Sequence, residues 1–508
     1  MKRFLTFAML MSMVICFSLS GCASKDSADS SSSSEETTEV DSNAPDANKL
    51  VESDIKVTDT YENSNDGEHA ITMSGEAKIY KNIGVTKTGE ADGDEADFYG
   101  ENSAVFATNG ANAGIADSLI KTDGTHANAI FSYGEGTTVT VADSLIKTTG
   151  NCSGGLMTTG GGTTNATNLT IETTGNSSAA IRSDRGGGNV KVAYGYYETE
   201  GVGSPVIYST ANIEVDEAYL QSSASQGVVV EGKNSVKLNN CNMVASNTKK
   251  NSDKSEFYQA VMLYQSMSGD SDEGISQFSM TDGNLINNNG DVFFVNNTSA
   301  EISLENVTIN NLDTNGVFLR AAAAGWGNEG ANGGKLNLYC KKQTINGNIL
   351  VDDISTLNMY LNSTSNFYGA INPEGQSGEV FVEINDRAIW ILTEDSYVSG
   401  LRCDATGINL NGHKLYIDGV EYIEGNDSEG QAFSTEMKSV SSGKGGPDGG
   451  DGGTPPDMAS ADGKGKTPPD MASGDGKGGT PPDGGEGGKG GTPPDGGKGG
   501  TPPDKPAN

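Results

Sequence analysis

The heptapeptide A-D-S-L-I-K-T occupies residues 116–122, and the same seven residues recur at 142–148, 26 positions later. Weaker echoes follow at comparable spacing, at residues 171–175, 197–201, 220–223 and 243–247. Between successive echoes lie a short apolar segment and a strictly alternating segment. The chain therefore repeats three short predicted strands in a period of roughly 22 to 33 residues.

Glycine, asparagine, serine and aspartate separate these predicted strands, as expected for tight corners. A repeat of three short strands cannot bury its apolar face alone, whereas stacked repeats can bury a continuous core. The sequence therefore predicts an all-β solenoid. Each strand would pair with its counterpart one coil away, at a spacing of about 4.8 Å.

The pattern resembles the right-handed parallel β-helix of the pectin-lyase-like superfamily and of adhesin-like bacterial surface lipoproteins. The resemblance covers residues 101–423 and implies about twelve or thirteen coils. The resemblance also implies that the helix is right-handed. It predicts the architecture but not the function, because proteins with this fold include lyases, hydrolases, adhesins and spacers. We expect residues 50–100 to form an N-terminal capping region and residues 353–423 the closing coils, with Trp390 in the core.

The N-terminus has the features of a secretory signal: Lys2 and Arg3, an apolar run over 4–19, and then L-S-G-C ending at Cys22. It resembles a bacterial lipoprotein signal of residues 1–21. The resemblance implies cleavage before Cys22 and a diacylglycerol on its thiol. The protein would then be anchored on the extracytoplasmic face of the cell membrane. An ordinary secretory signal with a chance cysteine is the alternative.

Two segments have compositions that cannot form a core. Residues 22–49 are rich in serine and acidic residues and predict a disordered tether. Residues 424–508 are rich in glycine, proline, lysine and aspartate and contain five T-P-P-D repeats, which predict a disordered tail.

The charge balance excludes one class of partner. The chain has 33 Lys and Arg against 68 Asp and Glu, so it repels nucleic acid.

Beyond Cys16 in the signal and Cys22, four cysteines remain: Cys152, Cys241, Cys340 and Cys403. Their spacing matches no zinc pattern. Two disulfides are compatible with an even count, but isolated buried thiols are favoured. The oligomeric state is not fixed by the sequence.

Loops that follow the second strand of each coil should gather on one edge of the solenoid. Those at 183–189, 265–274 and 320–334 are the most distinctive. An aromatic side chain beside amide and acidic groups is suited to stacking on a sugar ring. We therefore name as candidate glycan-binding residues Trp326, Asn328, Glu329, Arg320, Asp184 and Arg185. Two alternatives stay open: an indole that fills a gap beneath its own loop, and a salt bridge within the 182–185 segment.

Two acidic runs raise the question of calcium, which prefers carboxylate oxygens. The candidate ligands are Asp92, Asp94, Asp97, Asp270 and Asp272. Neither run has the EF-hand spacing, so solvated acidic loops are the alternative.

No enzyme motif is complete. Asp352-Asp353 and Gly412-His413 supply fragments of a polygalacturonase-like site, but the remaining elements are missing. The sequence therefore favours a lipid-anchored surface protein that displays a rod for adhesion or for binding polysaccharide or host glycan. The alternatives are a polysaccharide lyase or glycoside hydrolase on the same fold, and a structural spacer without catalysis.

Overall fold

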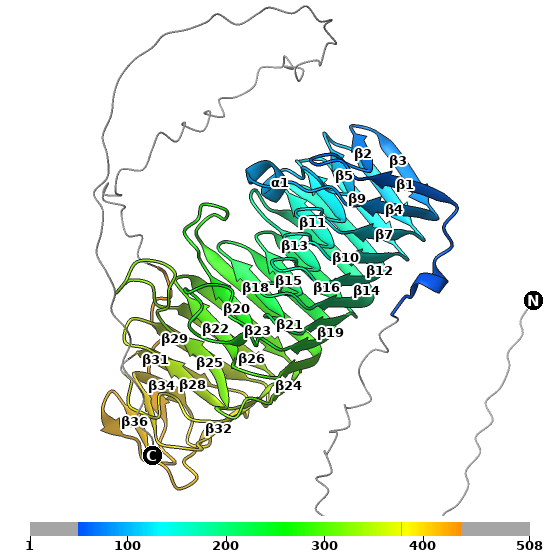
Figure 1. Cartoon of the computed structure of the whole chain (residues 1–508). Coiled ribbons are helices and arrows are strands. Elements are labelled where there is room, and N and C mark those ends of the chain that lie inside the picture. The colour runs from blue at the N-terminus through cyan, green and yellow to red at the C-terminus, as the bar shows by residue number, and fades with distance from the viewer. Residues whose placement is uncertain (1–48, 377, 438–508) are drawn as a thin grey trace, which may run out of the picture. The chain divides into compact units, whose positions relative to one another are not determined.

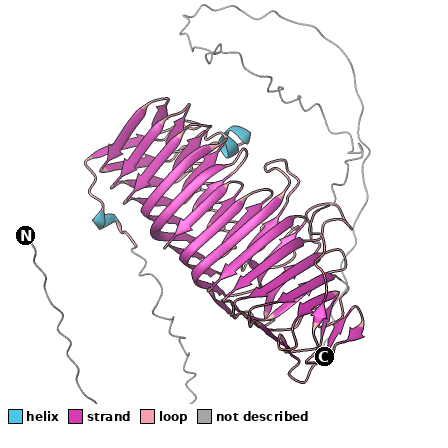
Figure 2. Cartoon of the chain, turned by 180° about the vertical axis from the view of Figure 1, so that it is seen from behind, coloured by secondary structure: helices cyan, strands magenta, loops and turns pink. Residues whose placement is uncertain are grey.

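The computed structural model describes residues 49–376 and 378–437. Short strands stack one behind another along an elongated body (Figure 1), and nearly all of their pairings are parallel. The architecture is a large all-β solenoid consistent with a parallel β-helix. Helix is confined, within these residues, to η1 (Glu52–Asp54) and α1 (Asp94–Phe98), which Figure 2 shows on opposite sides of the stack.

An eleven-stranded parallel sheet forms one wall of the stack. Its strands are β2 (Ile71–Ser74), β5 (Val105–Thr108), β8 (Ile130–Tyr133), β11 (Leu156–Thr159), β13 (Ile181–Ser183), β15 (Ile207–Ser209), β18 (Val228–Glu231), β20 (Gln259–Tyr264), β22 (Asp291–Asn296), β25 (Val317–Ala321) and β28 (Asn348–Val351).

A twenty-stranded sheet supplies the remaining walls. Its strands are β1 (Asp59–Asn63), β3 (Ala77–Lys81), β4 (Ile83–Lys87), β6 (Asn112–Ala116), β7 (Leu119–Thr122), β9 (Thr138–Ala142), β10 (Leu145–Thr148), β12 (Gly162–Thr173), β14 (Gly188–Thr199), β16 (Asn212–Asp216), β17 (Tyr219–Ser222), β19 (Ser235–Ala245), β21 (Ile275–Asn287), β23 (Ser299–Glu305), β24 (Thr308–Asn311), β26 (Lys335–Lys341), β29 (Thr356–Asn362), β31 (Glu379–Ile384), β34 (Gly400–Cys403) and β38 (Ser428–Glu429).

Two small sheets lie in the C-terminal coils. One contains β27 (Thr344–Asn346), β30 (Asn366–Tyr368), β32 (Ile389–Ile391) and β35 (Ile408–Asn409), and the other β33 (Ser396–Val398), β36 (Leu415–Ile417) and β37 (Val420–Glu421).

The repeated heptapeptides stack directly on each other. Strand β7 pairs with β10 so that Ile120 lies beside Ile146 and Lys121 beside Lys147. Identical side chains in register put like charges next to each other, which is unfavourable. Glu52 of η1 offsets this repulsion, because its carboxylate lies 2.8 Å from the ammonium of Lys121 and 3.7 Å from that of Lys147.

Inward side chains form one continuous apolar core along the stack. In its middle, the ring of Phe293 lies 5.7 Å from that of Phe278 and 5.4 Å from that of Phe318, measured between centroids. Trp390 is fully buried, and its indole N–H donates to the carbonyl of Gly369 at 2.9 Å. The prediction that Trp390 belongs to the core is confirmed.

Coil stacking begins earlier along the chain than the sequence indicated. Within the expected capping region of residues 50–100, β2 pairs with β5, β3 with β6 and β4 with β7. The segment that carries α1 separates β4 from β5 and lengthens this repeat. That extra length obscured the period in the sequence.

The described chain also doubles back at its C-terminal side. After β38, which pairs antiparallel with β34, the segment 430–437 crosses earlier coils in reverse order. The amide of Phe433 donates to the side chain of Asn358 at 2.9 Å, and the amide of Met437 donates to the hydroxyl of Ser299 at 3.0 Å. Residues 424–437 were expected to belong to a disordered tail, but they follow a defined path that we call the C-terminal strap.

The N-terminal side is fixed in a comparable way. Lys49 forms ion pairs with Glu172 at 2.9 Å and with Glu198 at 3.1 Å, and its ammonium lies 4.2 Å from the centroid of the Tyr196 ring. The chain therefore joins the solenoid beside β12 and β14, and then runs back to β1.

Several predictions fall on residues that the structure does not describe. These are the signal peptide of residues 1–21, the lipidation site Cys22, most of the tether and the T-P-P-D repeats. Among the described residues, no helix has the length and apolar character needed to cross a membrane.

Candidate functional site

The outer face of the eleven-stranded sheet carries large side chains that loops cover. Successive strands place one outward residue of each coil in register: Phe131, Met157, Arg182, Tyr208, Val229, Met262, Phe294 and Arg320. Part of this column belongs to a second apolar cluster, outside the main core, that includes Tyr264 and Trp326. The loops predicted to gather on one edge therefore pack onto this face.

Trp326 lies half-buried in the 320–334 loop. Its ring packs edge-on against Tyr264, with centroids 5.2 Å apart and planes at 69°. The side-chain amide of Asn332 donates to the Trp326 carbonyl at 2.8 Å, which fixes the loop from inside. Asn328 and Glu329 are exposed beside it. Both interpretations left open by the sequence therefore hold in part. The indole fills space beneath its own loop, and part of its ring remains exposed to solvent.

A buried carboxylate lies in the same cluster. Glu231 is 1% exposed and accepts hydrogen bonds from the hydroxyls of Tyr208, Tyr264 and Ser266; the Tyr264 bond is 2.9 Å long. Burial raises the pKa of both tyrosines well above the ordinary value, so they remain hydroxyl donors at neutral pH. This network makes Tyr264, on which Trp326 packs, a rigid support.

Arg320, on the outer face of the eleven-stranded sheet, is held by contacts with Asp291 and Phe257. Its guanidinium forms a two-point contact with Asp291, at 2.6 Å from Nε to Oδ2 and 3.2 Å from Nη2 to Oδ1, and stacks 4.3 Å from the Phe257 ring centroid. Burial raises the pKa of the Asp291 carboxyl even though Arg320 opposes that shift. The structure therefore uses Arg320 for an internal ion pair.

Asp184 and Arg185 also have internal partners. Asp184 is 4% exposed and accepts from Nη2 of Arg182 at 2.8 Å, so the predicted salt bridge within this segment is confirmed. Arg185 pairs with Asp94 at 3.2 Å and with Asp270 at 2.9 Å, and its guanidinium lies 3.7 Å from the ring centroid of Phe98. Arg185 thereby links α1, its own loop and the 265–274 loop.

The five candidate calcium ligands take different positions. Asp94 and Asp270 face Arg185, whereas Asp97 faces His126 at 2.7 Å. Asp92 accepts a hydrogen bond from the amide of Gly93, and Asp272 is exposed. The positive charge that lies between Asp94 and Asp270 is therefore the guanidinium of Arg185. Calcium binding by these residues stays an untested prediction.

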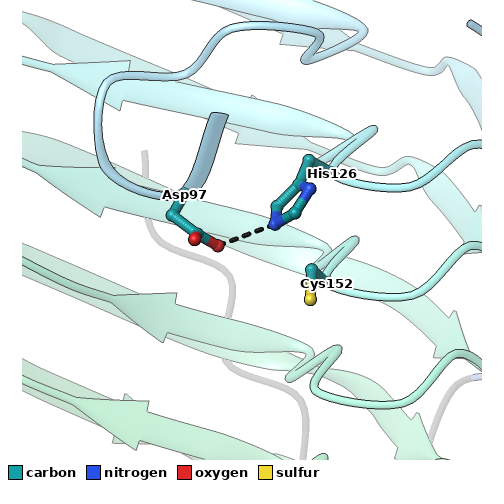
Figure 3. A group of neighbouring side chains, drawn as sticks. All are labelled: Asp97, His126 and Cys152. Atoms are coloured by element: carbon teal, nitrogen blue, oxygen red, sulfur yellow. Dashed lines mark hydrogen bonds and ion pairs between the residues drawn. The ribbon is translucent and has the colours of Figure 1, made fainter. Parts of the chain in front are cut away.

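One cluster brings together three different metal-ligating side chains: Asp97, His126 and Cys152 (Figure 3). Their donor atoms all lie within 4.8 Å of one another, and it is the one such group in the part of the chain that the structure describes. Asp97 raises the pKa of His126 to about 10, and His126 in turn lowers the pKa of Asp97. Cys241, Cys340 and Cys403 are free and buried, as favoured from the sequence, while Cys152 is free and half-buried.

Asp97 was predicted as a calcium ligand, and its association with His126 and Cys152 was not predicted. A usable signal was present: His126 and Cys152 are 26 residues apart, which equals the spacing of the repeated heptapeptides. Two residues one period apart occupy the same place in neighbouring coils.

We found no family model, no curated protein and no solved structure that matches this chain.

Proposed function

We propose that the protein is a lipid-anchored bacterial surface protein whose right-handed β-helical rod, of the pectin-lyase-like and adhesin-like type, binds carbohydrate through the 320–334 loop. Its anchor would be an acylated Cys22 on the extracytoplasmic face of the membrane. The ligand would be a cell-wall polysaccharide or a host glycan.

One observation carries the carbohydrate part of the proposal: Trp326 is partly accessible and rigidly supported. Tyr264 contacts the indole edge-on, and Glu231 fixes the hydroxyl of Tyr264 from below. A preorganised ring loses little entropy when a sugar stacks on it, which favours binding. The exposed amide of Asn328 and carboxylate of Glu329 offer the hydrogen-bonding groups that sugar hydroxyls need.

The proposed glycan-binding site contains fewer residues than the sequence predicted. Arg320, Asp184 and Arg185 are engaged in ion pairs, and releasing any of them would leave a charged partner unpaired: Asp291, the guanidinium of Arg182, or Asp270. We therefore assign contact with the glycan to Trp326, Asn328 and Glu329.

A polysaccharide-binding screen of the mature chain tests the proposal, run with and without calcium. We expect Trp326→Ala to weaken binding about fivefold, since a stacked ring is worth roughly 1 kcal/mol. Tyr368→Ala is the matched control, because Tyr368 is an aromatic residue 41% exposed on β30. Equal binding by Trp326→Ala and the wild type would refute the assignment. A folded wild type that binds no polysaccharide would instead favour a spacer.

A further inference from the structure

The corner that follows β7, β10, β12 and β14 has the same backbone conformation in four successive coils. The residue four positions after each of these strands has a positive φ: +57° at His126, +54° at Cys152, +55° at Ser177 and +65° at Gly203. An amide ladder stacks these corners, since the amide of His126 donates to the carbonyl of Asn151 and that of Cys152 to the carbonyl of Asn176. His126 and Cys152 therefore occupy equivalent places one coil apart.

Cysteine is an unusual choice at this corner. A left-handed backbone favours glycine, as at Gly203, and a side chain there is strained by about 1–2 kcal/mol. Most of the described non-glycine residues with a positive φ are asparagine or aspartate, and Cys152 is the one cysteine among them. The chain thus has two metal-ligating residue types in adjacent coils, both at a backbone conformation in which glycine would be less strained.

The third donor comes from outside the coils. Helix α1 places Asp97 over the corner, with its Oδ1 2.7 Å from Nε2 of His126. Two contacts of Arg185, with Asp94 and with the Phe98 ring, hold α1 in place. Figure 3 shows the Asp97 carboxylate directed at the imidazole of His126, with the Cys152 side chain beside them on the next coil.

The orientation of the imidazole suits a metal ligand. Nδ1 of His126 lies 2.9 Å from the backbone carbonyl of Ala91, to which it donates. A second hydrogen bond of this kind, from the nitrogen that does not bind the metal, is typical of ligating histidines. A cysteine–histidine–carboxylate relay is not favoured, because Ala91 and Asp97 occupy both ring nitrogens and leave neither to accept the thiol proton.

We propose that Asp97, His126 and Cys152 bind a divalent transition-metal ion of the zinc class. Zinc takes sulfur, nitrogen and oxygen ligands in a tetrahedron, with ligand atoms about 3.3 to 3.6 Å apart. The observed donors lie between 2.7 Å and 4.8 Å apart, so shifts of about 1 Å would complete the geometry. His126 is buried while Asp97 and Cys152 are half-buried, which leaves a fourth position for water.

Cobalt(II) is the probe that tests this site. The mature chain is freed of metal with a chelator and titrated with Co²⁺, and a thiolate-to-cobalt absorption band is followed in the near ultraviolet. We expect this band in the wild type, its displacement by Zn²⁺, and its loss in Cys152→Ser. His126→Gln should weaken Co²⁺ binding at least about tenfold, because loss of one ligand or its support has effects of that size.

The matched control is Cys241→Ser, which removes a buried thiol outside the cluster. It should keep the band, and circular dichroism should show that each variant is folded. A wild type without the band would overturn the proposal, as would a band that persists in folded Cys152→Ser. The residues involved are separate from the 320–334 loop, so this result is independent of carbohydrate binding.

Discussion

Replacement of Cys152 by glycine should raise the stability of the metal-free protein relative to replacement by alanine. The φ of Cys152 is +54°, at which any side chain with a Cβ is strained by about 1–2 kcal/mol. Glycine escapes this strain but loses about 0.5–1 kcal/mol more backbone entropy on folding. The difference predicts that Cys152→Gly is about 0.5–1 kcal/mol more stable than Cys152→Ala. At an ordinary strand or helix position the sign would be reversed.

Urea denaturation in the presence of a chelator measures this difference. Both variants lack the thiol, so comparison between them isolates the backbone effect. The transition midpoint should be higher for Cys152→Gly, with the same dependence on urea concentration in both variants. A glycine variant that is equally stable or less stable than the alanine variant would refute the strain argument. It would also remove one reason for regarding this corner as functional.

Four further predictions concern the core, two ion pairs and the proposed lipid anchor. Phe293→Ala should lower the free energy of unfolding by about 3–5 kcal/mol, with hydrogen-exchange protection lost in neighbouring coils and retained in the first ones. The pKa of His126 is raised from 6.5 to about 10, so the stabilisation that its imidazolium provides is fully present below pH 6.5 and is lost as the pH rises through 10. In the presence of a chelator, the free energy of unfolding of His126→Gln should therefore fall less steeply than that of the wild type between pH 6.5 and 10. Asp291→Asn should destabilise the protein by about 1–3 kcal/mol in thermal unfolding, because it leaves the guanidinium of Arg320 without its anionic partner. Cys22→Ser should shift the protein from the membrane fraction to the soluble fraction, and an unchanged distribution would argue against lipid anchoring.

The periodic part of the fold could be predicted from the sequence because the same order of short strands and polar corners recurs along it, even though the spacing varies. The two copies of A-D-S-L-I-K-T stack in register, as their spacing of 26 residues indicated. The first coil was not recognised because the α1 segment interrupts it. Composition also misplaced the start of the tail, since the C-terminal strap of residues 424–437 is held by hydrogen bonds to Asn358 and Ser299, which no local pattern reveals.

Less of the candidate site could be predicted from the sequence, because its residues contact partners in other coils. Arg185 meets Asp270, 85 residues later, and Arg320 meets Asp291, 29 residues earlier. Whether an arginine on a loop is free or paired depends on how such loops fold over the sheet. Trp326 stands out in the sequence because glycines flank it, but its contact with Tyr264 depends on that same packing.

The C-terminal strap and the segment around Lys49 determine how the solenoid would respond to mechanical force. A pull on the chain before Lys49 acts first on its ion pairs with Glu172 and Glu198, and only later on the strands of the first coil. A pull on the chain after Met437 must detach the strap from Ser299 and Asn358 before it reaches β34. A load applied at either end would thus reach these side contacts before it reaches the strands of the coil stack.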